Sequence, residues 1–392
     1  MYKYLKIWSI LFLFPISLMS QNSVDLVLSQ IEKNNTTLSA LRKSADANKI
    51  SNKTDIYLQN PEVEFNYLWG NPSVIGNRKD MIIKQTFDFP TVYNYKSQIS
   101  DLKNEQVELE FQKQRKLLLM QTRLLCIDLV YLNVLKSELS KRLFHAQLIA
   151  KSYKSKYDVG ECNILEYNKS QLNLLNAGNE LESIDIERIA LLSELTRLNG
   201  GLLIGFNDST FQSTVIPVDF EKWYVSAEQN NPVLSWLKQE VEISQKQTKL
   251  NLAMSLPKFQ TGYMSEKVLG QQFQGISLGF SIPLWENKNK VKFAKVNTIA
   301  LESIASDNKL QFYNQLKTLH TKAIGLQKNV NNYRLNLVSF DNSELLKKAL
   351  DKGEISLINY ITELSLYYES VNKLLELEKE MNKTLAELHQ FL

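Results

Sequence analysis

Histidine and cysteine are the side chains that most often bind metal ions or attack substrates, and this chain has few of either. The histidines are His145, His320 and His389, and the cysteines are Cys126 and Cys162. No histidine has a second ligand three or four residues further along, and the seven methionines do not cluster. The sequence therefore predicts no metal site and no cofactor, and the long separation of the cysteines argues against a disulfide.

Motifs for catalysis and for nucleic-acid binding are also missing from the sequence. We find no Gly-rich phosphate-binding loop and no nucleophile elbow, so an enzyme is not predicted. The 46 basic residues nearly balance the 42 acidic residues, which leaves a net charge of +4. Nucleic-acid-binding proteins usually carry concentrated positive charge, and this composition does not favour one.

The first twenty residues have the pattern of an export signal. Lys3 and Lys6 precede an apolar stretch over 7–19, and Ser20 is a suitable small residue before cleavage at Gln21. A transmembrane anchor is the alternative, but the apolar stretch is too short to cross a bilayer as a helix. We expect residues 1–20 to be removed after export, and no cysteine near the cut offers a site for lipid attachment.

The remaining chain contains an internal repeat. A displacement of 193 residues places the second half on the first from residue 87 to residue 195, and upstream the best displacement is 196 residues. A length difference in one loop explains the change. The matching positions include Phe87 and Phe280, Pro90 and Pro283, Asp158 and Asp351, Gly160 and Gly353, Glu161 and Glu354, and Tyr167 and Tyr360.

Each repeat has the same predicted order of elements, and the low content of 13 Gly and 8 Pro favours long helices. The first repeat covers 21–199, with a helix over about 25–57, two strands within about 61–90 and a helical hairpin over about 91–199. The hairpin turns at Gly160. Its first helix, from Thr91 to Asp158, would be about 100 Å long.

The second repeat covers 231–392 and is predicted in the same way. A helix over about 231–253 precedes two strands within about 257–285 and a helical hairpin over about 290–392. The first helix of that hairpin runs to about 351, and the chain turns at Gly353. Residues 200–230 between the repeats are expected to form an irregular connector, because Gly200, Gly201, Gly205 and Pro217 interrupt them.

Apolar and polar residues alternate in the strand segments, which places the apolar ones on a single face. Phe65, Tyr67 and Trp69 share one face of the first strand, and Ile276 and Phe280 share one face of the last. A soluble sheet packed on a core is the usual explanation of such a pattern. Here the neighbouring sequence is all helix, so an apolar outer face and a polar inner face favour the wall of a membrane β-barrel.

Four strands are too few to close a barrel, and open sheet edges do not occur in lipid. We therefore expect several copies of the chain to share one barrel. Phe65, Tyr67, Trp69 and Trp285 are candidates for the aromatic belt at the membrane interface, with ordinary strand packing as the alternative.

The order of motifs resembles the TolC-like outer-membrane factor family, also called outer membrane efflux proteins. The resemblance covers 25–392. In the segment from Leu256 to Trp285 the sequence looks most like the heavy-metal efflux branch of the family. The resemblance to the family rests on these motifs: Asn60-Pro61, Gln85-Thr86-Phe87-Asp88-Phe89-Pro90, Tyr157-x-x-Gly160, Leu195-x-x-Leu198-x-Gly200, Leu256-Pro257, Ile282-Pro283 and Gly353.

The resemblance implies a mainly α protein with a membrane β-barrel. Three chains would form a homotrimer with a twelve-stranded barrel in the outer membrane and a long α-helical coiled-coil tunnel through the periplasm. Such proteins are passive exit ducts that dock to a periplasmic adaptor and an inner-membrane pump, here of the RND type. The implied partners are further copies of the chain, the adaptor, the pump and outer-membrane lipid, without nucleic acid.

The resemblance also assigns the two glycine turns to the periplasmic tip. Residues flanking the turns are candidates for contact with the adaptor: Lys156, Gly160, Glu161, Lys352, Gly353 and Glu354. Glu166, Asn359 and Glu363 are candidates for the tip constriction, where a ring of carboxylates would favour cations. Glu166 has an alternative role, because Asn163-x-x-Glu166 resembles a helix capping box and Ser356 is a similar cap for the second helix.

The sequence thus predicts an outer-membrane channel subunit of a tripartite efflux system for heavy metals or drugs. A duct for type I protein secretion is an alternative within the same class. A periplasmic coiled-coil adaptor or scaffold is an alternative from a different class, although adaptors flank their hairpins with soluble β domains.

Overall fold

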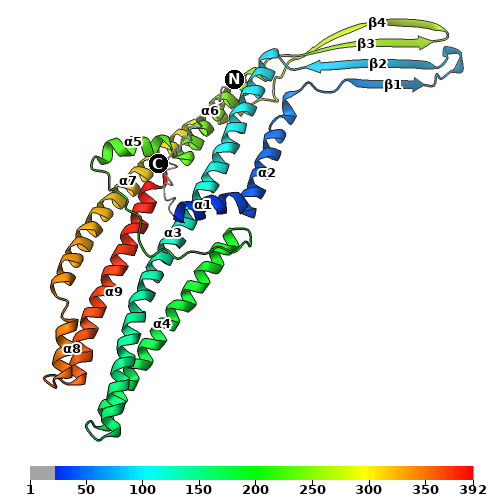
Figure 1. The fold of residues 1–392 in the computed structure, drawn as a ribbon. Coiled ribbons are helices and arrows are strands. Elements are labelled where there is room, and N and C mark those ends of the chain that lie inside the picture. The colour runs from blue at the N-terminus through cyan, green and yellow to red at the C-terminus, as the bar shows by residue number, and fades with distance from the viewer. Residues whose placement is uncertain (1–22, 392) are drawn as a thin grey trace, which may run out of the picture.

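The computed structural model describes residues 23–391, so the expected export signal lies outside the described residues. Long helices form the larger part of the molecule, and a four-stranded sheet extends from one end of them (Figure 1). The two helical hairpins run side by side, and their turns lie at the end furthest from the sheet.

The order helix, helix, strand, strand, helix, helix occurs twice, which confirms the predicted duplicated fold. In the first half the elements are α1 (Ser23–Asn34), α2 (Thr36–Ser51), β1 (Glu62–Leu68), β2 (Arg78–Phe87), α3 (Pro90–Asp158) and α4 (Ile164–Leu198). In the second half they are α5 (Phe220–Gln229), α6 (Pro232–Ala253), β3 (Lys258–Val268), β4 (Gln271–Ser281), α7 (Lys290–Ser339) with α8 (Ser343–Asp351), and α9 (Leu357–Leu388). Short 3₁₀ turns cover Thr54–Ile56, Ser73–Ile75 and His389–Phe391.

The helix predicted over 25–57 is wrong in one respect, because the chain forms two helices there. Asn35 adopts an extended backbone conformation between α1 and α2, and its side-chain oxygen accepts a hydrogen bond from the Leu38 N–H. Its amide group donates to the carbonyl oxygen of Leu198. Asparagine is a good N-cap because its side chain replaces a missing backbone partner, so a buried Asn35 ends one helix and starts the next.

The expectation of a wholly irregular connector over 200–230 is also wrong. Asp219 caps α5, which buries Phe220, Tyr224 and Ala227. Asn231 then caps α6 and is buried as Asn35 is. A displacement of 196 residues places α1 on α5 and Asn35 on Asn231, so the connector already contains the first helix of the second repeat.

The long helix predicted to run from 290 to 351 is interrupted between α7 and α8. Asp341 accepts hydrogen bonds from both the backbone N–H and the hydroxyl of Ser343. Such local side-chain bonds compete with the helical pattern and favour a new helix start. The corresponding helix of the first half, α3, continues without a break for 69 residues.

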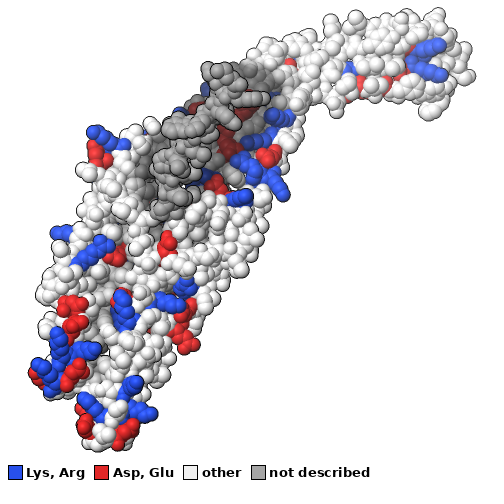
Figure 2. All heavy atoms as spheres, viewed as in Figure 1, with Lys and Arg blue, Asp and Glu red and all other residues white. Residues whose placement is uncertain are grey.

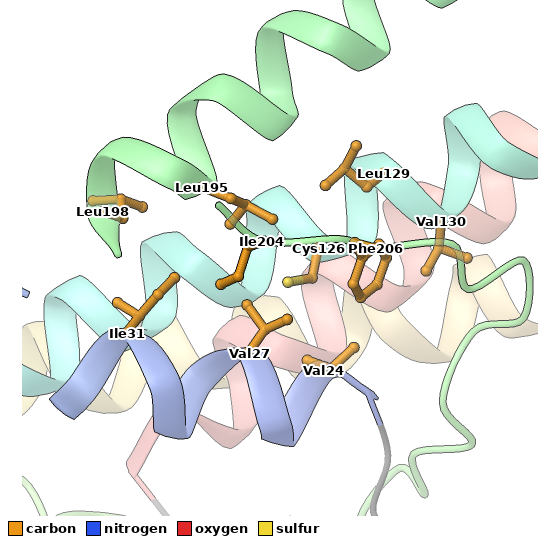
Figure 3. Close-up of a cluster of buried hydrophobic side chains, with 10 residues drawn as sticks. All are labelled: Val24, Val27, Ile31, Cys126, Leu129, Val130, Leu195, Leu198, Ile204 and Phe206. Carbon is orange, nitrogen blue, oxygen red and sulfur yellow. The ribbon is translucent and has the colours of Figure 1, made fainter. Parts of the chain in front are cut away.

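Two matching clusters of apolar side chains hold the middle of the molecule. In Figure 3, Val24, Val27 and Ile31 of α1 point towards α3, and Ile204 and Phe206 of the connector fill the space beside Leu195 and Leu198 of α4. The second cluster joins α5, α7 and α9 in the same way, through Phe220, Tyr224, Phe312, Leu316 and Leu388. Leu195 and Leu388 correspond in the repeat, so the duplication extends to the core.

One helix of the described chain, α3, is long and apolar enough to cross a membrane by length and composition. Cys126, Leu129 and Val130 of this helix lie in the cluster of Figure 3, where they pack against α1 and α4. The apolar content of α3 therefore has a packing role in the helical part of the molecule.

Candidate functional site

The sheet has the strand order β1-β2-β3-β4, with every neighbouring pair antiparallel. Its register places Phe65 opposite Met81, Ile83 opposite Tyr263, and Tyr263 opposite Ile276. Since side chains alternate between faces, one face of the sheet carries an apolar set from all four strands. We call it the apolar face, and its members are Val63, Phe65, Met81, Ile83, Phe87, Phe259, Tyr263, Ile276, Leu278 and Phe280.

The apolar face is uncovered in the described chain. Phe65 is 68% exposed, Ile276 81% and Phe280 72%. In a soluble protein, burying such a face in a core would be strongly favourable, at about 25 cal/mol for each Å² of apolar area. A contiguous exposed apolar surface marks a site that another molecule or a membrane covers.

The opposite face carries the paired charges of the sheet together with the apolar Ile82, Met264 and Phe273, and its basic residues lie beside carboxylates. The Lys84 ammonium lies 2.9 Å from both Glu62 and Glu64, and Arg78 lies 2.8 Å from Asp80 and 3.2 Å from Glu266. Lipid would not solvate these groups, whereas water in a channel lumen would. The two faces therefore suit different solvents.

The dimensions of the sheet match a membrane. An 11-residue strand such as β4 is about 37 Å long, and at the tilt usual in barrels it spans about 28 Å. The apolar band of a membrane barrel is about 25 Å tall.

The aromatic candidates lie at the two ends of the sheet. Tyr67 and Trp69 are at the hairpin end, with ring centroids 5.5 Å apart in an edge-to-face arrangement. Trp285 follows β4 at the helical end and is 79% exposed. Aromatic residues at both ends of a membrane barrel form its two interfacial belts, and the ends of this sheet carry such residues.

The two predicted tip turns have the same backbone geometry. Gly160 has φ of +78°, and the N–H of Glu161 donates to the carbonyl oxygen of Lys156 at 2.8 Å. Gly353 has φ of +75°, and the N–H of Glu354 donates to the carbonyl oxygen of Ala349 at 2.9 Å. Both are Schellman turns, in which the left-handed residue is almost always glycine.

Charged side chains surround the two turns and point outward. Glu161, Lys352 and Glu354 are exposed, and the Lys156 ammonium lies 5.2 Å from the ring centroid of Tyr153. Figure 2 shows charged atoms of both signs gathered at the ends of the two hairpins. The hairpin ends also pack on each other through Tyr153, Leu350, Leu357, Tyr360 and Leu364, so the structure brings the two turns together.

The three candidates for the constriction have different surroundings. Glu166 forms the predicted capping box, because its carboxylate accepts from the Asn163 N–H and its own N–H donates to the Asn163 side chain at 2.9 Å. The Asn359 N–H donates to the Ser356 hydroxyl, which confirms the second cap. Glu363 lies one turn further along α9, in a hollow beside Asn336 and Tyr367.

The cysteines and histidines have structural surroundings. Burial raises the pKa of the Cys126 thiol to about 12, which makes it a poor nucleophile, and both cysteines are free thiols. His320 bonds the carbonyl oxygen of Pro217 at 2.7 Å, and His389 bonds that of Val215 at 3.1 Å. His145 is exposed on α3.

β3 contributes to the apolar face, although its pattern in the sequence is faint. Phe259, Thr261 and Tyr263 alternate with Gln260 and Gly262, and this is a recognisable although weak period of two. Only the register shows that Phe259 lies between Phe87 and Phe280, and that Tyr263 lies between Ile83 and Ile276, which makes the face continuous.

No protein-family description and no curated protein sequence matches this chain. Solved structures do match it. The Campylobacter jejuni CmeC outer membrane channel has a TM-score of 0.77 at 13% identity, over 95% of this chain and 85% of that one. CusC has a TM-score of 0.77 at 13% identity, over 93% and 91% of the two chains. The Vibrio cholerae outer membrane protein VceC has a TM-score of 0.75 at 12% identity, over 94% and 96%. The chain therefore has the fold of the TolC-like outer-membrane efflux channels.

Proposed function

We propose that this protein is an outer-membrane channel subunit that serves as a passive exit duct for efflux. The observation that carries the proposal is the sheet, with one uncovered apolar face, one salt-bridged polar face and a length that suits a bilayer. The helices would extend from it into the periplasm for about 100 Å. The likeness to known channels agrees with this arrangement.

Self-association follows from the two edges of the sheet. Within the described chain β1 and β4 each have one neighbouring strand, so their outer edges are unpaired. An even number of antiparallel strands makes β4 of one copy antiparallel to β1 of the next, which permits a closed ring. A homotrimer with twelve strands satisfies both edges in lipid, where unpaired backbone groups are costly.

The tip would supply the contact with the rest of an efflux system. A periplasmic adaptor would meet the turns at Gly160 and Gly353 through Lys156, Glu161, Lys352 and Glu354, and an inner-membrane pump of the RND type would supply the energy. Heavy metal ions or drugs are the cargo that we propose. A type I protein secretion duct would use the same wall and tip, and the genes adjacent to this one would distinguish the two.

The oligomer is tested by extracting the protein from outer membranes with a mild detergent and measuring its mass by light scattering. We expect a trimer and co-flotation with phosphatidylcholine vesicles. A soluble monomer that stays in the periplasmic fraction would refute the channel and would favour the scaffold alternative.

The role of Glu166 is tested by Glu166→Gln in planar bilayers. Glutamine still accepts the hydrogen bond from Asn163 and keeps the capping box, but it removes the negative charge. Loss of cation preference with unchanged stability would assign Glu166 to the constriction. Unchanged cation preference would leave it as a helix cap only.

A further inference from the structure

We propose that the apolar face of the sheet binds the phosphate of an anionic lipid headgroup at its hairpin end, through Lys79 and Lys267. This inference rests on the proposed channel function, because it requires that the apolar face meets lipid. It concerns a site at the hairpin end of the sheet, away from the helical tip.

The two lysines lie side by side on the same side of the sheet as the apolar face. The register pairs Tyr67 with Lys79, Lys79 with Lys267, and Lys267 with Gln272, so these four side chains form one row across the sheet. The next row towards the helices contains Phe65 and Met81 beside Tyr67 and Lys79, and Ser265 and Gln274 beside Lys267 and Gln272. Lys79 therefore borders the apolar side chains directly, and Lys267 lies next to it in the same row.

The charges of this row are not compensated within the described residues. Lys79 and Lys267 are both exposed, and among residues 23–391 neither forms an ion pair with a carboxylate. On the opposite face, by contrast, Lys84 and Arg78 have carboxylate partners, and the Lys258 ammonium lies 3.4 Å from Glu286. Like charges directly opposite each other destabilise a sheet, so a ligand with negative charge would relieve the repulsion.

The neighbouring groups suit a headgroup at a membrane interface. The Lys79 ammonium lies 5.5 Å from the ring centroid of Tyr67, and the Tyr67 and Trp69 rings are in contact. Interfacial aromatic residues lie at headgroup depth, and long lysine side chains extend towards the same level. The hairpin end of the sheet lies away from the helices, so the headgroup belongs to the outer leaflet.

The occupant is a lipid headgroup because the lysines adjoin the apolar face. Acyl chains would contact Phe65 and Met81 while the phosphate accepts hydrogen bonds from the two ammonium groups. A free phosphate ion would gain nothing from the apolar contacts. Each basic residue near an anionic surface strengthens binding by a factor of roughly five, so the pair contributes about 30-fold.

The test compares the trimer with the double variant Lys79→Gln/Lys267→Gln by native mass spectrometry in neutral detergent. The probes are bisphosphorylated lipid A and phosphatidylcholine. We expect lipid A to bind the double variant about 30-fold more weakly. Binding of phosphatidylcholine should not change, and Lys79→Arg/Lys267→Arg should keep the affinity for lipid A.

The matched control is Lys328→Gln/Lys347→Gln, which removes the same charge from exposed positions on α7 and α8. Lipid A should bind this control as it binds the parent. Equal binding by the sheet variant, or displacement of lipid A by excess inorganic phosphate, would overturn the proposal. Failure of the parent protein to enter phosphatidylcholine vesicles would instead refute the channel function.

Discussion

His320 and His389 illustrate how the chemically versatile residues of this chain are used. Each ring bonds a backbone carbonyl oxygen of the connector, at Pro217 and at Val215. Both bonds fasten an extended segment that has few backbone partners of its own, so packing and hydrogen bonding explain these residues without a catalytic role.

At the same scale, a salt-bridge cluster of Arg42, Lys49 and Glu108 joins α2 to α3. Two nitrogens of Arg42 lie 2.8 and 2.9 Å from the Glu108 carboxylate, and the Lys49 ammonium lies 2.9 Å from it. The hydrogen bonds from Arg42 and then Lys49 lower the pKa of Glu108 to about 2. The Glu108 carboxylate therefore stays ionised far below neutral pH, and the salt bridges to Arg42 and Lys49 persist with it.

Glu108→Gln should reduce the dependence of stability on pH. Because the pKa of Glu108 is lower in the folded state, its stabilisation is complete above about pH 4.5 and is lost as the pH falls towards about 2. The carboxylate is 37% exposed, so after allowance for solvent screening we expect a loss of about 1 kcal/mol at neutral pH.

The measurement is thermal unfolding of parent and variant between pH 6 and pH 2. The difference in unfolding temperature between the parent and Glu108→Gln should shrink as the pH falls. Glu110→Gln is the control, because Glu110 pairs with Lys113 of its own helix. If the difference in unfolding temperature stays constant with pH, the ionised Glu108 carboxylate is not the source of the stabilisation.

At the scale of elements, glycine has opposite effects in the turn and in the helix of one hairpin. Gly160 has φ of +78° in the tip turn, whereas Gly178 lies inside α4. A Cβ atom would meet no other atom within 4 Å at either position. Any effect of adding it therefore comes from the backbone alone.

Gly160→Ala should destabilise the hairpin by about 1 kcal/mol, because the left-handed conformation is unfavourable for residues with a Cβ. Gly178→Ala should stabilise it by about 0.5–1 kcal/mol, because alanine loses less backbone entropy in a helix. Both changes in the free energy of unfolding can be measured by unfolding in guanidinium chloride, followed by the circular dichroism of the helices. Effects of the same sign would show that the turn geometry is wrong.

At the scale of the whole molecule, the proposed channel predicts that neighbouring residues of β4 face different solvents. Ile276 belongs to the apolar face and Ser277 to the opposite one. Ile276→Arg should impair insertion by about 2–4 kcal/mol, since a lipid-facing charge near the bilayer centre is costly. Ser277→Arg should insert normally and alter conductance, because in the proposed channel the face that carries Ser277 lines the lumen.

Heat-resistant trimers in outer-membrane extracts would be counted for both variants. Equal assembly of the two proteins would mean that lipid does not contact the apolar face. If neither variant assembles into trimers, β4 has a packing role on both faces, and the proposal that Ser277 faces a lumen is contradicted.

The sequence by itself determined the class of each long element, the two glycine turns and the duplication, because these depend on local periodicity and local backbone preference. It also indicated the apolar strands Glu62–Leu68 and Gln271–Ser281. Only the tertiary structure decided that the chain breaks at Asn35, that Phe220–Gln229 is a helix, and that Lys79 lies opposite Lys267. Those features depend on contacts between residues far apart in the sequence, such as Asn35 with Leu198, which no local pattern contains.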